Sequence, residues 1–552
     1  MGAPGPAGGV YVGRWRALII LGAAQFLMVL DTSVMNVSIS RLVEDFDTEV
    51  TAIQAVITLY TLVMAAFIIT GGKVGDKIGR RRAFAAGLVV YGTGSALTAV
   101  APTLWVLTLG WSVIEGLGAT LVLPALAALV AGTYTGRDRA VAYGVVGGLA
   151  GAGIAVGPLL GGWVTTYLTW RLVFAGEVVV VVAILCCIGW ITDRKQPADD
   201  TPAHLDMTGA ALSAVGLALV VLGVLQSGSW GWLKPRNSPV TIFGFSPTVF
   251  VITAGAVVLW LFRAWERHQE ARHKEPLVRF SLFGIPSLRA GLAMLLSQNL
   301  ILLGLFFTIP LYLQVVQGLD AFQTGLRLLP VSITMLVASM SGPLLGRIAS
   351  PRTVVRLGLL VLFAAILWLL ATIRPELDDV SFAVAMAVLG LGMGLLASQL
   401  GNVVQSSVGE SQRSEVGGLQ YTAQNLGSSL GTALIGAITV GALAGVFTHR
   451  IADNPQISDA VRQQTGITIE AGVSFVSTEQ VRIAAERANI PEAEADALVD
   501  EYAAAQLAGL KAAILLAAAI TLAGLPFTRH LPAQRLEEPK HRNGHHQQAC
   551  RR

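Results

Sequence analysis

The chain has 552 residues, of which 54% are hydrophobic and only 13% are charged, and its net charge at neutral pH is +4. Soluble domains carry about 25% charged residues, so this composition excludes a soluble globular protein and predicts a membrane protein with many spans. The three cysteines are two neighbours in an apolar run, Cys186 and Cys187, and Cys550 near the end, so no disulfide framework is expected.

Fourteen apolar stretches are long enough to cross the membrane as helices, since about 30 Å of hydrocarbon requires about 20 helical residues. The first six are 17–38, 53–72, 83–100, 104–131, 141–162 and 172–191, and the last six are 290–313, 325–348, 354–373, 380–404, 417–446 and 509–526. Two more, 208–225 and 248–262, lie between these sets. The first stretch lacks an A-x-A cleavage site, so we expect it to be retained as a span rather than removed as a signal peptide.

Basic residues alternate between the connections. They precede span one and follow spans two, four, six, eight and ten, whereas the connection after span one is acidic, with Glu44, Asp45, Asp47 and Glu49. Because positive residues concentrate in cytoplasmic loops, both termini are expected on the cytoplasmic side, which requires an even number of spans. The same alternation places segment 449–507 outside the cell, where short amphipathic helices over 479–489 and 491–507 are expected to cap the external mouth.

The connection between spans two and three reads GKVGDKIGRRR, from Gly72 to Arg82. Its glycines permit tight backbone packing, and Asp76 faces several cations at a helix end. Such a loop can form a latch of charged groups that is made in one conformation and broken in another. The alternative is a simple cytoplasmic retention signal.

Span five reads GVVGGLAGAGIAVGPLLG between Gly144 and Gly161. At about 100° per residue its small residues fall on two faces: Gly144, Gly147, Gly148, Gly151, Pro158 and Gly162 on one, and Gly153, Gly157 and Gly161 on the other. Small residues let neighbouring backbones approach closely in a bilayer. We therefore expect a helix wedged between two partners and bent near Pro158, with dense packing alone as the alternative.

These segments resemble motifs of the major facilitator superfamily. The loop is similar to the cytoplasmic signature G-x-x-x-D-[RK]-x-G-R-[RK]-[RK], which is matched by Gly72, Asp76, Lys77, Gly79, Arg80, Arg81 and Arg82. Span five is similar to the antiporter motif G-x8-G-x3-G-P-x2-G, matched by Gly144, Gly153, Gly157, Pro158 and Gly161. Span one, LDTSVMNVSI, resembles a motif of the fourteen-span drug/proton antiporter branch, matched by Leu30, Asp31, Thr32, Asn36 and Val37.

The chain departs from the family pattern in two places. The span-four motif R-x-x-Q-G, whose arginine is often linked to proton transfer, is replaced by Ser112 at the arginine and Glu115 at the glutamine. In the second-half counterpart of the signature loop, Gly346 stands where the aspartate is expected.

Three carboxylates lie within predicted spans: Asp31, Glu115 and Glu177. An ionisable group in a span costs about 2.5–3.5 kcal/mol on insertion scales and marks a functional site by default. A proton and a cationic substrate would compete for such a carboxylate, which is the simplest exchange mechanism; the alternative is a structural carboxylate held by a hydroxyl or amide. The same candidate set includes Asn36, and further amides at Gln25, Gln298, Asn299, Gln399, Asn402, Gln420, Gln424 and Asn425 hold helices together or line a central cavity.

The resemblance implies an all-α, fourteen-span transporter of the major facilitator fold. Its expected parts are a cytoplasmic N-terminus (1–16), a six-helix bundle (17–192), two extra transmembrane helices with a linker (193–289), a second six-helix bundle (290–528) and a disordered cytoplasmic tail (529–552). We expect a monomer in the plasma membrane that exports lipophilic or cationic small molecules in exchange for protons by alternating access. No metal or organic cofactor and no nucleic acid is expected.

The sequence disfavours three other functions and leaves a fourth open. The P-loop pattern is missing, which disfavours ATP hydrolysis, and no nucleophile or His/Asp/Glu cluster at one interface supports a lipid-modifying enzyme. A channel would carry a ring of charges or a filter sequence. The remaining alternative is a proton-coupled transporter of a specific metabolite, including an importer, because alternating access does not fix the direction of transport.

Overall fold

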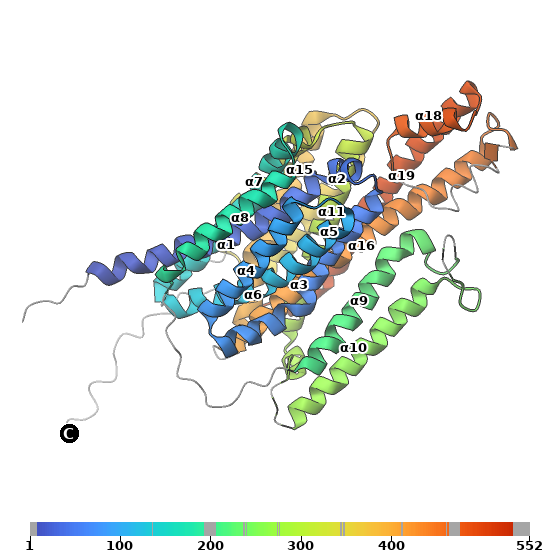
Figure 1. Ribbon diagram of the computed structural model, residues 1–552. Helices are drawn as coiled ribbons and strands as arrows, with labels where there is room; N and C mark the ends of the chain where they lie inside the picture. Colours follow the sequence, from blue (N-terminus) through green and yellow to red (C-terminus); the bar gives the residue numbers. More distant parts are fainter. Residues whose placement is uncertain are drawn as a thin grey trace, which may run out of the picture.

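The computed structural model describes residues 8–134, 136–191, 206–235, 238, 240–272, 274, 276–342, 345, 348–409, 412–459, 461–462 and 475–533. Over these residues the chain is built from helices, and β-structure is limited to an isolated bridge between Ile242 and Phe245. The long helices run side by side in one general direction (Figure 1). This architecture confirms the expected all-helical fold class.

The first group of helices occupies the positions of the first six predicted spans. It comprises α1 (Gly8–Val37), α3 (Val50–Ile78), α4 (Arg80–Ala99), a helix made of α5 (Leu104–Leu107), η1 (Thr108–Glu115) and α6 (Gly116–Thr133), then α7 (Gly136–Tyr167) and α8 (Arg171–Cys186), with the short helices α2 (Ile39–Asp45) and η2 (Ile188–Trp190). Within η1 the backbone is π-helical, which the sequence pattern did not predict.

A helical hairpin and a second group follow. The hairpin is α9 (Met207–Trp230) and α10 (Pro247–Ala271), joined by η3 (Phe280–Gly284) to the second group, which comprises α11 (Pro286–Leu311), η4 (Tyr312–Val316), α12 (Ala321–Met340), α14 (Pro351–Thr372), α15 (Asp379–Ser406), α16 (Arg413–Asp453), α18 (Thr478–Arg487), α19 (Glu492–Gly524) and η6 (Leu525–His530). The eighth predicted span, 248–262, was too short, since α10 continues to Ala271.

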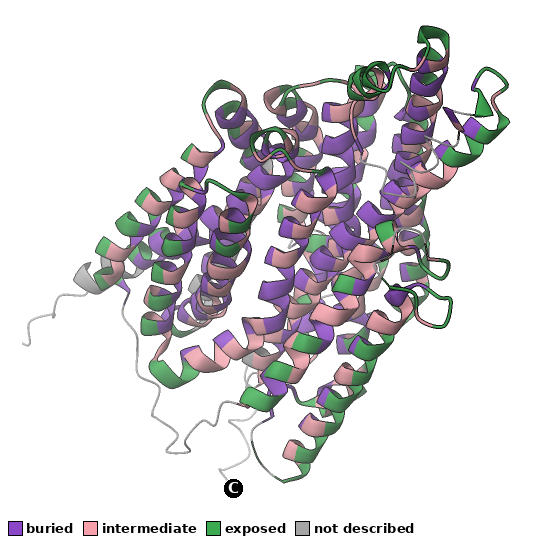
Figure 2. Ribbon diagram, turned by 45° about the vertical axis from the view of Figure 1, so that its right-hand side comes forward, coloured by how far each residue is buried: buried purple, intermediate pink, exposed green. Residues whose placement is uncertain are grey.

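Eleven helical segments of the described chain are long and apolar enough to cross a membrane. Three further helices, α4, α7 and α8, coincide with the predicted spans three, five and six. α4 begins with three arginines and α8 has only 16 residues. Large apolar side chains are exposed along several of the eleven, for example Trp260 at 63% and Val337 at 64%, and Figure 2 shows such exposed positions along the outward faces of the helices. These faces suit contact with lipid.

Helix α7 packs between α1 and α12, as its two small-residue faces predict. A Cβ atom on Gly153 would lie 3.1 Å from Val29 of α1, and one on Gly161 would lie 2.8 Å from Val34 of α1. On the other face, a Cβ atom on Gly162 would overlap the carbonyl oxygen of Ala321 at the start of α12. The wedge is therefore confirmed, and glycine permits it because any side chain would push the backbones apart.

The hairpin docks through α9 on the seam between α3 and α16, and α10 lies beyond it at the edge of the molecule (Figure 1). Leu62 of α3, Leu217 and Val221 of α9, and Ala433 of α16 form one apolar cluster. α9 thus contacts one helix of each group, α3 and α16, and covers the seam between the groups.

Two helices extend well beyond their predicted spans. α16 has 41 residues and α19 has 33. The separate amphipathic helix predicted over 491–507 was wrong: it is the first half of α19, continuous with the predicted span 509–526. Gly509 does not break α19, because it permits the close approach of α16, where a Cβ atom would lie 2.6 Å from the carbonyl oxygen of Thr439. The other predicted helix, over 479–489, is confirmed as α18.

Some predictions fall outside the described residues. Gly346, in the second-half counterpart of the signature loop, is one of them, and so are residues 534–552 of the tail and 463–474 of segment 449–507.

The contact between α7 and α12 yields a stability prediction. Gly325→Ala in α12 places a methyl group against the backbone of Pro158, whereas Gly148→Ala in α7 meets no atom within 4 Å. Overpacking costs about 1–3 kcal/mol, so Gly325→Ala should lower the midpoint of thermal unfolding in detergent, and Gly148→Ala should leave it unchanged or raise it. Equal midpoints for the two variants would contradict the wedge.

Candidate functional site: a buried carboxylate cluster

Asp31 lies in α1 and is 1% exposed. Both of its carboxylate oxygens accept hydrogen bonds from the indole Nε1 of Trp111, at 2.9 and 3.0 Å. The ring of Trp111 stacks on Tyr60 of α3, with the ring centroids 4.6 Å apart and the planes 3° from parallel. Stacking against Tyr60 of α3 fixes the plane of the Trp111 ring and so directs its indole N–H toward Asp31.

Glu115 ends the π-helical segment η1 and is fully buried. No hydrogen bond reaches either of its carboxylate oxygens within the described part of the chain. π-helical turns inside α-helices are rare and concentrate at functional sites. Trp111 lies in the same turn, so one local distortion positions both the donor to Asp31 and the side chain of Glu115.

Glu177 lies in α8 and is 1% exposed. Its Oε2 accepts hydrogen bonds from Ser95 Oγ at 3.1 Å and from the hydroxyl of Tyr91 at 3.4 Å, both on α4. Its Oε1 has no partner in the described structure.

These three side chains meet at one point inside the first helix group. One carboxylate oxygen from each of Asp31, Glu115 and Glu177 lies within 4.8 Å of the other two. The groups that act on them electrostatically are one another and the neighbouring Trp111, Tyr60, Tyr91 and Ser95, all of them uncharged except the carboxylates. Three negative charges this close and this deeply buried are not tolerated together, so protons or a bound cation must neutralise part of the cluster.

Ser112, at the position of the family's arginine, takes part in helix packing. Its Oγ donates a hydrogen bond of 2.8 Å to the carbonyl oxygen of Val56 in α3. The side chain thus ties η1 to α3 and brings no positive charge to the cluster.

Asn36 is buried but is not hydrogen-bonded to the carboxylates. Its Nδ2 donates to the carbonyl oxygen of Thr32 one turn earlier in α1, at 2.8 Å, and its Oδ1 has no partner in the described structure.

The signature loop joins α3 to α4 through Gly79, whose φ of 96° lies in the region that favours glycine. Arg80 Nε lies 3.7 Å from Asp76 Oδ1. Arg80 also donates to the carbonyl oxygen of Ala128, in the second half of α6, at 3.3 Å. Gly72 lies against Pro124 of α6. The structure therefore places Asp76 and Arg80 in one contact at the helix ends, with Arg81 beside them on α4 and half-buried.

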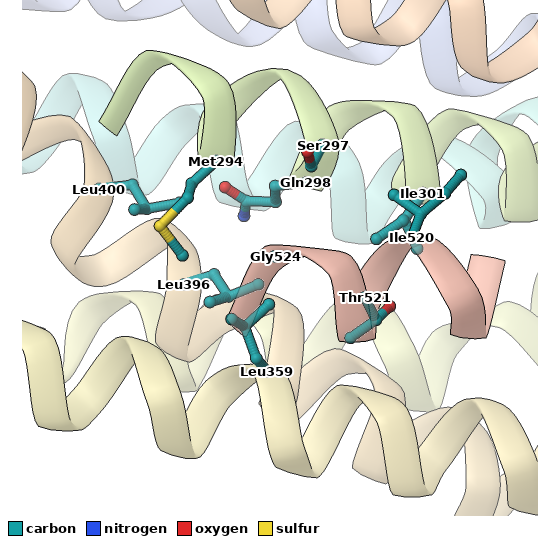
Figure 3. A pocket seen from close by; sticks show the side chains of 10 residues that line it. All are labelled: Met294, Ser297, Gln298, Ile301, Leu359, Leu396, Leu400, Ile520, Thr521 and Gly524. Atoms are coloured by element: carbon teal, nitrogen blue, oxygen red, sulfur yellow. The ribbon is translucent and has the colours of Figure 1, made fainter. Parts of the chain in front are cut away.

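Four of the eight predicted amides, Gln298, Asn299, Gln399 and Asn425, donate to backbone carbonyl oxygens. Gln298 of α11 donates to the carbonyl oxygen of Met393 at 3.1 Å, and Asn425 of α16 donates to that of Tyr421 at 2.9 Å. Gln298 also lines a cavity of about 10 Å³ in the second group (Figure 3), together with Met294, Ser297, Ile301, Leu359, Leu396, Leu400, Ile520, Thr521 and Gly524. This volume suits about one water molecule, so the cavity is too small for a transported compound.

The sequence predicted the carboxylates but not their partners. Trp111, Tyr60, Tyr91 and Ser95 surround the cluster, and Tyr60 and Tyr91 are at most 1% exposed. The available signal was the spacing of Trp111 and Glu115 by four residues, which places both on one side of a helix.

Comparisons with known proteins agree with the architecture. Residues 21–432 match the Major Facilitator Superfamily. The chain belongs to this family. It is 31% identical to a puromycin resistance protein of Streptomyces alboniger, over 78% of the chain and 83% of that protein.

Two further relatives cover the chain more completely. It is 27% identical to a tetracenomycin C resistance and export protein of Streptomyces glaucescens, over 81% of the chain and 80% of the relative. It is 25% identical to a multidrug efflux pump of Mycolicibacterium smegmatis, over 93% of the chain and 96% of the relative.

The fold is also that of solved transporters. A bacterial homologue of the human lysosomal transporter Spinster, in an inward-facing and unoccupied conformation, superposes with a TM-score of 0.60 at 14% identity, covering 94% of this chain and 97% of that one. The chain is therefore a polytopic membrane transporter of the superfamily.

The indole donor gives a direct test of the cluster. Trp111→Phe keeps an aromatic ring against Tyr60 but leaves Asp31 without its two hydrogen bonds, so we expect a loss of about 1–3 kcal/mol in stability. The measurement is the midpoint of thermal unfolding in detergent. Trp105→Phe, at a position that is 79% exposed, is the control and should have no effect. If Trp111→Phe and Trp105→Phe have the same unfolding midpoint, the hydrogen bonds from Trp111 do not contribute to stability.

Proposed function

We propose that this protein exports lipophilic or cationic small molecules in exchange for protons. The observation that carries the proposal is the cluster of Asp31, Glu115 and Glu177, which cannot stay fully ionised and therefore must take up protons or a cation. A cation bound near the cluster favours release of these protons, and their return favours release of the cation. Export is supported by relatives named for antibiotic resistance and export and for multidrug efflux.

The proposed arrangement has fourteen spans. The eleven candidate spans, which include α9 and α10, make fourteen together with α4, α7 and α8. Twelve of the fourteen form two bundles of six, and α9 and α10 are the two linking spans between them. We propose that the protein lies in the plasma membrane. The alternation of basic residues supports cytoplasmic termini, with α18 and the adjoining ends of α16 and α19 outside the cell. We propose that the protein is a monomer, needs no cofactor and catalyses no chemical reaction.

Alternating access requires contacts that open on one side at a time. Gln314 of η4, directly after α11, donates to the carbonyl oxygen of Val37 at 2.8 Å and accepts from the backbone N–H of Ser40 at 3.2 Å. Gln54 of α3 donates to the carbonyl oxygen of Thr432 in α16 at 2.8 Å. In the proposed topology both bonds involve outer ends of helices: those of α1 and η4 in the first bond, and that of α3 in the second. They would hold the outer side closed and would break when the outer side opens.

The proton gradient supplies enough energy for this exchange. Moving one charge through 100 mV is worth about 2.3 kcal/mol, which corresponds to about a fifty-fold concentration ratio. No ATP-binding element is required.

The function is tested by transport in proteoliposomes with an imposed pH gradient and a panel of lipophilic cations. We expect at least one compound to move against its gradient while protons move the opposite way. If no compound moves and none changes the proton flux, the proposal is wrong. Transport of both species in the same direction would instead support the import alternative.

The carboxylates are tested in the same vesicles. Glu115→Gln and Asp31→Asn should lower pH-driven transport to the level of empty liposomes, because the neutral amides cannot exchange protons. Glu44→Gln, at an exposed position paired with Arg41, is the matched control and should transport normally. Normal coupling in both cluster variants would remove these residues as proton carriers.

A further inference from the structure

A basic pocket lies between the end of α10 and the start of α11, remote in sequence from the carboxylate cluster. It has a volume of about 550 Å³ and is lined by Arg263, Arg267, Phe280, Ser281, Phe283, Gly284 and Arg289. Arg263 and Arg267 are one turn apart on α10, and Arg289 lies in the first turn of α11. Two helices that are neighbours in sequence thus direct three arginines toward one hollow.

The positive charge of these arginines is not balanced by the protein. Within the described part of the chain, no ion pair or side-chain hydrogen bond engages their guanidinium groups. Of the described acidic groups nearby, Glu270 accepts from Ser281 Oγ at 2.7 Å and the buried Glu266 accepts from the backbone N–H of Val278 at 3.0 Å, and neither is ion-paired with these arginines. Like charges that converge without a partner favour a bound anion.

The opposite wall of the pocket is apolar. Phe280 and Phe283 stack with their centroids 5.6 Å apart, and Phe262 meets the edge of Phe280 at 5.8 Å. Guanidinium groups beside aromatic rings suit an anion that is itself attached to an apolar body.

We propose that this pocket binds the phosphate headgroup of an anionic phospholipid. Both α10 and α11 qualify as membrane spans, so the pocket opens where the helices leave the hydrocarbon. In the proposed topology this is the cytoplasmic surface, where basic pockets between helices hold lipid headgroups. Free phosphate is also an anion, but it would leave the Phe280 and Phe283 wall unused.

A lipid bound here would join the hairpin to the second helix group. Among the described residues, α10 packs mainly on α9 and η3, and its connection to α11 passes through the residues that form the pocket. The headgroup would neutralise the three arginines and fix the angle between α10 and α11.

The experiment measures thermal unfolding of the full-length protein in detergent as phosphatidylglycerol, phosphatidylcholine or inorganic phosphate is added. We expect phosphatidylglycerol alone to raise the unfolding midpoint. In Arg263→Gln/Arg267→Gln, the half-saturating phosphatidylglycerol concentration should rise about tenfold or more. The matched control, Arg272→Gln/Lys274→Gln, removes two charges from the same end of α10 outside the pocket and should bind as the wild type does.

Three results would overturn the proposal: equal stabilisation by phosphatidylcholine, equal weakening in the control, or full stabilisation by inorganic phosphate. If the arginine variant does not fold, Gly284→Trp decides the question, since it keeps every charge. A Cβ atom on Gly284 meets nothing within 4 Å, so the indole can enter the pocket. Loss of the phosphatidylglycerol effect in Gly284→Trp supports the lipid site, and an unchanged effect excludes it.

Discussion

The burial of three carboxylates at one point inside the first helix group is the constraint on which the rest of the structure depends. Desolvation and mutual repulsion make three charges untenable there, so the occupancy of the cluster by protons or a cation must be part of its stable state. Among the described residues, the surrounding helices supply neutral groups to the cluster: an indole N–H, a serine hydroxyl and tyrosine rings. The replacement of the family's arginine by Ser112 is consistent with this arrangement. A fixed guanidinium would neutralise one carboxylate permanently and remove one position from exchange.

Close helix packing makes that cluster compatible with movement. Glycines along α7 let it approach α1 of its own group on one side and α12 of the second group on the other, where Gly162 meets the backbone of Ala321. Few side-chain rotamers have to change when such surfaces slide or tilt. In the proposed mechanism, the hydrogen bonds of Gln54 and Gln314 hold the two helix groups together on the outer side only. The glycine faces of α7 present few side-chain atoms that would oppose a tilt.

The sequence predicted most helices and the three buried carboxylates, because apolar runs and ionisable residues within them are visible in one dimension. It did not predict that Asp31, Glu115 and Glu177 meet, since α1, η1 and α8 come together only through tertiary packing. The π-helical turn at Thr108–Glu115 was missed because hydrophobic periodicity does not distinguish it from an α-helix. The end of α16 was placed too early and the start of α19 too late, because a helix need not begin or end where its apolar segment does. The division into two bundles and two linking spans remains a prediction that the helix order supports.

Helix α16 illustrates one mechanical consequence. With 41 residues and a rise of about 1.5 Å per residue, it is a rod about 60 Å long; Gln54 of α3 binds it near its middle, at Thr432, and the Arg450–Glu501 ion pair lies near its C-terminal end. A tilt of about 10° about its midpoint would displace each end by about 5 Å. A tilt of the second helix group would therefore displace α18, which is held to the first turns of α19 by the Arg482–Asp496 ion pair, more than it displaces the centre of the bundle.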